Sequence, residues 1–210
     1  MAQIFISHSN KDDELVNFFS RSGVGTKVRI IFEEIEKICN GWITSEKIKA
    51  DIFNSNAIFV VLSSNVENIQ HTRDWVVAEA GAASNKDIWV FERNTDVGKI
   101  TIVTPFLRHY VVFEPNDNYL SYVHQIFESY DDSHVLGTVL LTTGIGAFLG
   151  KGEGAVAGAA AGLALSDRSS IRPVGVQIRC VYCSSSYNVH LPQDIKAFRC
   201  AVCNSNLSLI

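Results

Sequence analysis

Apolar and polar positions alternate along the first 130 residues in blocks that are typical of strands followed by helices. Five short apolar runs predict strands at residues 3–7, 28–32, 57–62, 88–91 and 110–113. The run 57–62 is continuous and rich in β-branched residues, which is typical of a strand buried on both faces. The alternation of strands and helices predicts an α/β fold, a doubly wound parallel sheet with helices on both faces.

The segments between these runs carry apolar residues at helical spacing. The residues predicted to mark four helices are Leu15, Val16, Phe18 and Phe19; Ile43, Ile48, Ile52 and Phe53; Trp75 and its neighbours; and Tyr119, Leu120, Val123, Ile126 and Phe127. Residues 8–13 are expected to form a loop that ends in a helix N-cap. Sites in such folds lie at the carboxyl ends of the strands, so residues 7–9 and the loop 33–42 are the expected positions of a site.

Length and charge limit the domain organisation and the partners. A chain of 210 residues has room for one ordinary domain and a smaller one beside it. Residues 1–166 carry a net charge of −7 and residues 167–210 a net charge of +3, and neither value predicts a nucleic-acid surface. The N-terminus carries no basic region followed by an apolar stretch, so we expect a reducing, cytoplasmic setting.

Trp75 and Glu79 lie one helical turn apart and therefore share one helix face. An indole that walls a pocket and a carboxylate that points into it form an arrangement suited to binding a sugar. On its own the pair is a weak signal, because a tryptophan in the core and a glutamate in water are common on amphipathic helices.

Three motifs in order resemble the Toll/interleukin-1 receptor (TIR) domain of the bacterial kind. They are the opening 5–12 (FISHSNKD), the central strand 57–63 ending in Leu-Ser, and the W-x-x-x-E signature at 75–79. The resemblance implies a flavodoxin-like, five-stranded parallel sheet. It also implies cleavage of the N-glycosidic bond of NAD⁺, with Glu79 as the catalytic residue, and a role in antiphage defence. The alternative is a non-catalytic adaptor that assembles partners. The loop 33–42 departs from the family pattern in having no proline.

The implied chemistry assigns roles to nearby residues. Neutral nicotinamide leaves a cationic pyridinium without an acid, and a carboxylate stabilises the oxocarbenium-like centre that remains. Ser7, His8 and Ser9 are the expected ribose and phosphate contacts, while Trp42 and Trp75 are expected to line the pocket. The alternatives are that His8 stabilises its turn and that Trp42 anchors its loop.

Five glycines recur at every fourth position in an apolar segment, namely Gly146, Gly150, Gly154, Gly158 and Gly162. The register predicts close helix packing in a glycine-zipper segment or hairpin over residues 133–168. The uncharged run 135–150 is shorter than the roughly 20 residues that span a bilayer. Membrane contact through 135–165, self-association in solution and a simple spacer remain three interpretations.

Cys180-x-x-Cys183 and Cys200-x-x-Cys203 are separated by 16 residues, a spacing typical of zinc ribbons. Four thiolates make a closed tetrahedral site, so structural Zn²⁺ is expected, with redox-active or unbound cysteines as the alternative. Cys39 stands apart as an expected buried thiol. The chain is therefore predicted to comprise a TIR domain at 1–132, the glycine-zipper segment at 133–168 and a zinc ribbon at 169–210.

Overall fold

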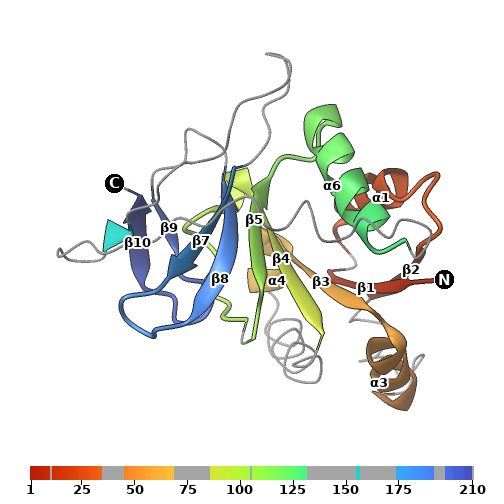
Figure 1. Ribbon diagram of the computed structural model, residues 1–210, viewed down its shortest axis with the longest axis horizontal. Helices are drawn as coiled ribbons and strands as arrows, with labels where there is room; N and C mark the ends of the chain where they lie inside the picture. The colour runs from red at the N-terminus through yellow and green to blue at the C-terminus, as the bar shows by residue number, and fades with distance from the viewer. Residues whose placement is uncertain are drawn as a thin grey trace.

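The computed structural model describes residues 1–9, 11–34, 45–68, 86–104, 106–131, 155–156, 174–191 and 197–209. Seven strands form one sheet in the order β2-β1-β3-β4-β5-β8-β7 (Figure 1). Adjacent strands run parallel except for β7, which is antiparallel to β8. The strands are β1 (Gln3–His8), β2 (Arg29–Glu34), β3 (Ala57–Leu62), β4 (Asp87–Arg93), β5 (His109–Phe113), β7 (Val174–Arg179) and β8 (Ser186–Leu191).

The five strands expected from the apolar runs are all present, as β1 to β5. Their order, 2-1-3-4-5, is that of flavodoxin-like doubly wound sheets, and the predicted α/β class is confirmed. The sheet does not end at β5, because β8 pairs with it in parallel at His109↔Asn188 and Val111↔His190. The expected five-stranded sheet is therefore too small by two strands, both supplied by the cysteine-containing segment.

Helices cover both faces of the sheet. On one face lie α1 (Asp13–Ser22) and α6 (Asp117–Ser129), and on the other lie α3 (Ser45–Asn54) and the short α4 (Ser64–Asn68), with a 3₁₀ turn, η1 (Asn94–Asp96), after β4. Ile48 and Ile52 of α3 are buried, as their spacing predicts, but Phe53 is exposed. The Lys86 ammonium lies 5.4 Å from the Phe53 ring, a cation–π contact at the surface.

The face under α1 and α6 is packed with aromatic rings. Phe19 of α1 contacts Phe59, Phe91 and Phe113 with ring centroids 5.1 to 6.3 Å apart. Offset and edge-on contacts of this kind add about 0.5–1.5 kcal/mol each to the burial itself. This packing fixes α1, and hence the loop that precedes it, against the sheet.

The opposite face has no third helix within the described residues. Among the described residues, the segment after β4 and the cysteine-containing segment add buried side chains to the core on this face. Backbone N–H of Thr104 donates to the Ala201 carbonyl at 2.7 Å, and the ring of Phe198 stacks on Tyr110 at 5.8 Å. Buried side chains of this segment that join the core are Ile178, Tyr187, Val189, Leu191, Phe198 and Leu207. Sheet and core thus continue across the predicted boundary between residues 168 and 169.

A second, three-stranded sheet has the order β6-β10-β9, formed by β6 (Ala155–Val156), β10 (Asn206–Leu209) and β9 (Ala197–Arg199). Ala155 and Val156 belong to the expected glycine-zipper helix, yet here they pair in parallel with β10. The prediction of helix is wrong at these two positions, because the edge of β10 opposite β9 supplies backbone partners for an extended segment. The rest of 133–168 lies outside the described residues.

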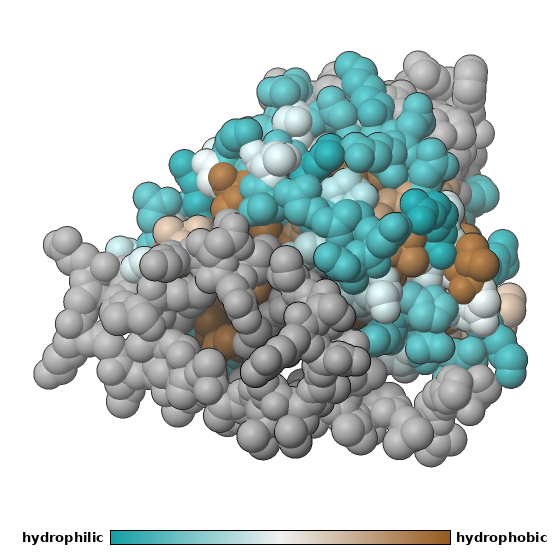
Figure 2. Space-filling view, turned by 90° about the horizontal axis from the view of Figure 1, so that it is seen from above, coloured by the Kyte–Doolittle hydropathy of each residue, from teal (hydrophilic) through white to brown (hydrophobic). Residues whose placement is uncertain are grey.

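The surface seen in Figure 2 is mainly hydrophilic over the described residues, with apolar side chains showing only in small patches. The large exposed apolar side chains in the described ranges are few, namely Met1, Val24, Phe53, Phe106, Val181 and Tyr182. Within these ranges no helix is both long and apolar enough to cross a bilayer.

Candidate active site and metal centre

The strand order reverses between β1 and β3, and the carboxyl ends of these two strands meet there. In doubly wound sheets this is the position of the ligand site. Ser7 and His8 end β1, Ser9 follows it, and Ser63 follows β3; all four side chains are buried. The predicted substrate contacts Ser7, His8 and Ser9 therefore lie at the expected edge of the sheet.

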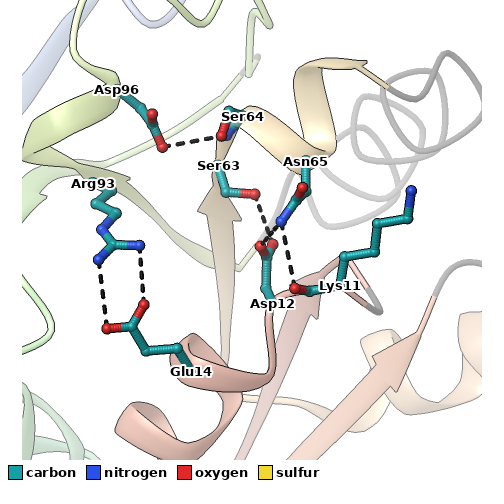
Figure 3. Close-up of polar contacts among 8 residues, drawn as sticks. All are labelled: Lys11, Asp12, Glu14, Ser63, Ser64, Asn65, Arg93 and Asp96. Atoms are coloured by element: carbon teal, nitrogen blue, oxygen red, sulfur yellow. Dashed lines mark hydrogen bonds and ion pairs between the residues drawn. The ribbon is translucent and has the colours of Figure 1, made fainter.

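Asp12 joins the two strand ends. Its carboxylate accepts a hydrogen bond from the Ser63 hydroxyl at 2.7 Å and another from the Asn65 amide at 2.6 Å (Figure 3). The Asn65 amide also reaches the Lys11 carbonyl at 3.4 Å, and the Ser63 oxygen accepts from the Val66 N–H at 3.3 Å. The loop after β1 is thus fastened to the first turn of α4.

The position of Asp12 before α1 matches the expected N-cap, but its side chain makes no capping hydrogen bond. Only its backbone carbonyl serves the helix, by accepting from the Val16 N–H at 2.9 Å. Local spacing suggested a cap because it does not reveal the partner Ser63, which follows β3 and lies 51 residues further along the chain. Asp12 and Asn65 are the site residues that sequence reasoning missed, and only the proximity of the two strand ends identifies them.

His8 has one nitrogen engaged and one free within the described residues. Its Nδ1 lies 2.8 Å from the Ser9 carbonyl oxygen. Because a carbonyl only accepts, Nδ1 carries the proton, and in the neutral ring Nε2 is an acceptor. Nε2 is buried and has no partner in the described ranges, while the ring meets Phe32 edge-on at 5.8 Å. His8 both stabilises its turn and keeps an acceptor available.

Charged residues surround the Asp12 cluster at the ends of β1, β3 and β4. Arg93 forms a two-point ion pair with Glu14, at 3.0 and 3.4 Å, and the Asp96 carboxylate accepts from the Ser64 N–H at 3.3 Å (Figure 3). The Arg93–Glu14 pair is partly exposed and contributes little to stability. Its effect is to tie β4 to α1 beside the site.

Glu92, on β4 near this edge, is buried and accepts a short hydrogen bond from the Tyr110 hydroxyl. Its second oxygen, Oε1, has no partner within the described residues. Burial raises the pKa of Glu92 to about 7, against the lowering effect of the Tyr110 bond, and the charge of Asp96 raises it further. A carboxyl that exchanges a proton near neutral pH thus lies in the core beside the site.

Three residues of the predicted site lie outside the described residues, namely Trp42, Trp75 and Glu79. Residues 69–85, which include the helix expected to carry Trp75 and Glu79, lie outside the described ranges and follow α4 in the sequence. Glu33 and Glu34, expected to open the loop 33–42, instead end β2. Cys39 also falls outside the described residues.

The four predicted metal ligands come together at one point. The sulfur atoms of Cys180, Cys183, Cys200 and Cys203 all lie within 4.8 Å of one another. Cys180 and Cys203 approach to 3.7 Å, and Cys183 and Cys200 to 3.9 Å. An all-sulfur set of four ligands on two turns fits Zn²⁺ in a closed tetrahedral site, which is structural rather than catalytic.

The two turns that present these sulfurs have the same local geometry. In each, the first cysteine carbonyl accepts from the N–H four residues later, at 2.9 Å for Ser184 and 2.8 Å for Asn204. Ser184 and Asn204 adopt positive φ angles of 62° and 61°, which close the turns after Cys183 and Cys203. Asparagine tolerates this region better than serine, so the first turn stores slightly more strain.

Neighbouring groups tie the cluster to the core. The Tyr187 hydroxyl donates to the Cys200 sulfur at 3.4 Å and accepts from the Ala201 N–H at 3.3 Å. Tyr187 is itself a buried residue of β8 in the large sheet. One predicted metal ligand, Cys200, is therefore hydrogen-bonded to a residue of the same sheet that carries the candidate active site.

Comparisons with known proteins give little further guidance. No protein-family model matches the chain, and no curated protein matches it. Among solved structures, the chain is similar to a diflavin flavoprotein A3 from Nostoc sp., with 12% identity and a TM-score of 0.39; the match covers 62% of this chain and 90% of that one.

Proposed function

We propose that the chain is a TIR-type NAD⁺ nucleosidase, which cleaves the nicotinamide N-glycosidic bond and yields ADP-ribose or a signalling derivative. The observation that carries the proposal is the joining of two motif segments by Asp12. The Asp12 carboxylate holds the loop of the opening motif, residues 5–12, against the end of β3. From there α4 leads in sequence toward Trp75 and Glu79. The strand order supports a site at this edge.

In this proposal Glu79 stabilises the positive charge that develops on the ribose as neutral nicotinamide departs. Ser7, His8 and Ser9 supply hydrogen bonds to ribose and phosphate oxygens. His8 enters this role with Nδ1–H fixed by the Ser9 carbonyl and with Nε2 free to accept from a ribose hydroxyl. Trp42 and Trp75 line the pocket around the flat ring.

The fold supports this assignment through rigidity at the loop. Because both Asp12 oxygens are engaged, the loop after β1 cannot separate from the end of β3 and the start of α4 without breaking two hydrogen bonds to a carboxylate. Hydrogen bonds to charged groups contribute about 1.5–3 kcal/mol each. A site held this firmly loses little entropy when it binds substrate.

Structural Zn²⁺ bound by Cys180, Cys183, Cys200 and Cys203 is part of the proposal, as is self-association through the TIR domain and the segment 133–168. In a bacterial cell the activity would serve antiphage defence. Residues 135–165 would associate with a membrane in one version of this proposal. The metal would contribute stability and no step of the reaction, because four protein ligands leave no open position.

The test is to incubate the purified, zinc-loaded protein with NAD⁺ and to measure nicotinamide release for wild type, Glu79→Gln and Glu128→Gln. Glu128, on α6, is the matched control, since it loses the same charge at a residue outside the candidate active site. We expect release by wild type and the control and at least a hundredfold loss in Glu79→Gln. Equal rates in all three proteins would exclude Glu79 as the catalytic residue. No release by any of them, from folded protein, would favour the non-catalytic adaptor.

A further inference from the structure

A cavity of about 340 Å³ opens at the amino ends of β4, β5 and β8, at the opposite edge of the sheet from the candidate active site. Its lining comprises Asp87, Arg108, His109, Gln177, Ser186, Tyr187 and Asn188. The volume lies near the lower end of the range for small-molecule sites. The candidate active site uses none of these residues.

The polar lining follows from the register of the strands. Trp89, His109, Asn188 and Gln177 are successive cross-strand partners on β4, β5, β8 and β7. Partners in register point to the same face of a sheet, here the face that α6 covers. Tyr130, just after α6, covers Trp89 by accepting from its Nε1–H at 2.8 Å. In this row of cross-strand partners Trp89 is apolar, whereas His109, Asn188 and Gln177 are polar. The cavity lies over the three polar residues.

His109 is a buried polar residue that lines this cavity. It is 5% exposed, its ring stacks on Trp89 at 3.8 Å, and its Nδ1 is buried and unpartnered within the described residues. Burial, aided by the Arg108 charge, lowers the pKa of His109 to about 4, so the imidazole is neutral at physiological pH. A neutral ring offers one donor and one acceptor.

The remaining lining adds hydrogen-bonding capacity without net charge. Arg108 is paired with Asp87 at 3.0 Å. Asn188 is half-buried and Gln177 is exposed, and each side-chain amide presents a donor and an acceptor side by side. An amide of this kind pairs at two points with the adjacent donor and acceptor of an adenine edge, and a carboxamide offers the same pattern.

We propose that this cavity binds an uncharged heterocycle with adjacent donor and acceptor groups, an adenine or carboxamide edge, through Gln177 and Asn188 with His109 as a third contact. The paired charges of Arg108 and Asp87 disfavour a phosphate or a carboxylate as the primary ligand. The binding site is separate from the proposed NAD⁺-cleaving edge and does not depend on that activity.

The test uses the full zinc-loaded chain and calorimetric titration with adenosine, nicotinamide, ribose and inorganic phosphate. The adenosine and nicotinamide arms distinguish the two sources of the same hydrogen-bonding edge. Variants Gln177→Ala and Asn188→Ala are compared with Arg179→Ala, an exposed residue of the same strand that does not line the cavity. We expect at least one of the two heterocycles to bind with a Kd in the millimolar range or tighter, and each amide variant to weaken it about tenfold or more.

Arg179→Ala should bind as wild type does. Gln177 is exposed, so its replacement leaves the fold intact even if Asn188→Ala proves unstable. Failure of both heterocycles to bind folded wild-type protein would overturn the proposal. So would an affinity that both amide variants retain, or tight binding of phosphate alone, which would assign the cavity to Arg108.

Discussion

Replacing Cys200 with serine removes one of four sulfur ligands from the metal centre, and the structure predicts that the damage spreads into the large sheet. A ribbon that folded as an independent unit would unfold alone and leave the rest of the chain intact. Here the rings of Phe198 and Tyr110 stack across the boundary, and both are almost fully buried. Release of the metal frees β9 and uncovers the surface of β5.

The size of the effect can be worked from these two rings alone. Exposing two large apolar side chains costs about 3–6 kcal/mol. For a chain of this length each kcal/mol lowers Tm by roughly 2–4 °C, so the expected fall is on the order of 10–20 °C. A domain stability of about 5–15 kcal/mol leaves little margin for such a loss.

The assay compares thermal unfolding of wild type, Cys200→Ser and Cys39→Ser, each with zinc and after removal of zinc with a chelator. Cys39→Ser is the control for loss of a thiol outside the cluster. Hydrogen exchange at Val60 and Val90, buried residues of β3 and β4, reports the large sheet directly. We expect earlier melting and faster exchange in Cys200→Ser and in chelated wild type. Unchanged exchange at these positions, with unfolding confined to residues 174–209, would refute the reasoning.

Three further changes test other parts of the structure. Asp12→Asn replaces an acceptor of the Ser63 and Asn65 hydrogen bonds; thermal unfolding should show a loss of about 1–3 kcal/mol and nicotinamide release should fall, whereas unchanged values would mean that the link is dispensable. The pKa of Glu92 rises on folding to about 7, so its contribution to stability should be lost as pH increases from about 4.5 to 7, by up to about 3 kcal/mol, and denaturation of Glu92→Gln should lack that slope. Gly175→Ala places a Cβ 2.8 Å from Cε1 of the His190 ring, whose Nδ1 lies 2.7 Å from the Tyr122 hydroxyl oxygen. Because this hydrogen bond holds the ring in place, denaturant unfolding should show a loss of about 1–3 kcal/mol in the free energy of unfolding. An unchanged free energy would mean that the ring moves freely.

Local patterns were sufficient to predict the first five strands. The continuous run of β3 and the apolar runs of β4 and β5 are buried in the structure as expected. The cysteine spacing likewise predicted that four sulfurs would meet. In each case the signal lies in residues close together in sequence or in a recurring ligand spacing.

Long-range contacts were beyond the same patterns. Nothing in the apolar run of β5 indicates that its outer edge pairs with β8 rather than facing solvent. Asp12 occupies the N-cap position of α1, but its carboxylate accepts a hydrogen bond from Ser63, after β3, and makes no capping hydrogen bond. Phe53 belongs to the predicted helical stripe of α3 but lies at the surface, because it directly follows buried Ile52 and points about 100° around the helix from it. These features are decided by tertiary packing.

The pairing of β5 with β8 also determines the order in which the sheet is completed. His109 pairs with Asn188, 79 positions later, so a growing chain presents β1 to β5 long before the strand that covers β5 exists. Until then β5 is an unprotected edge, able to pair with the same strand of another chain. Such distant pairing forms late, since a long loop must close first. The hairpin of β7 and β8 therefore protects this edge from aggregation only after it has paired with β5. On the proposal that the four cysteines bind zinc, removal of zinc would leave more chains with β5 unprotected.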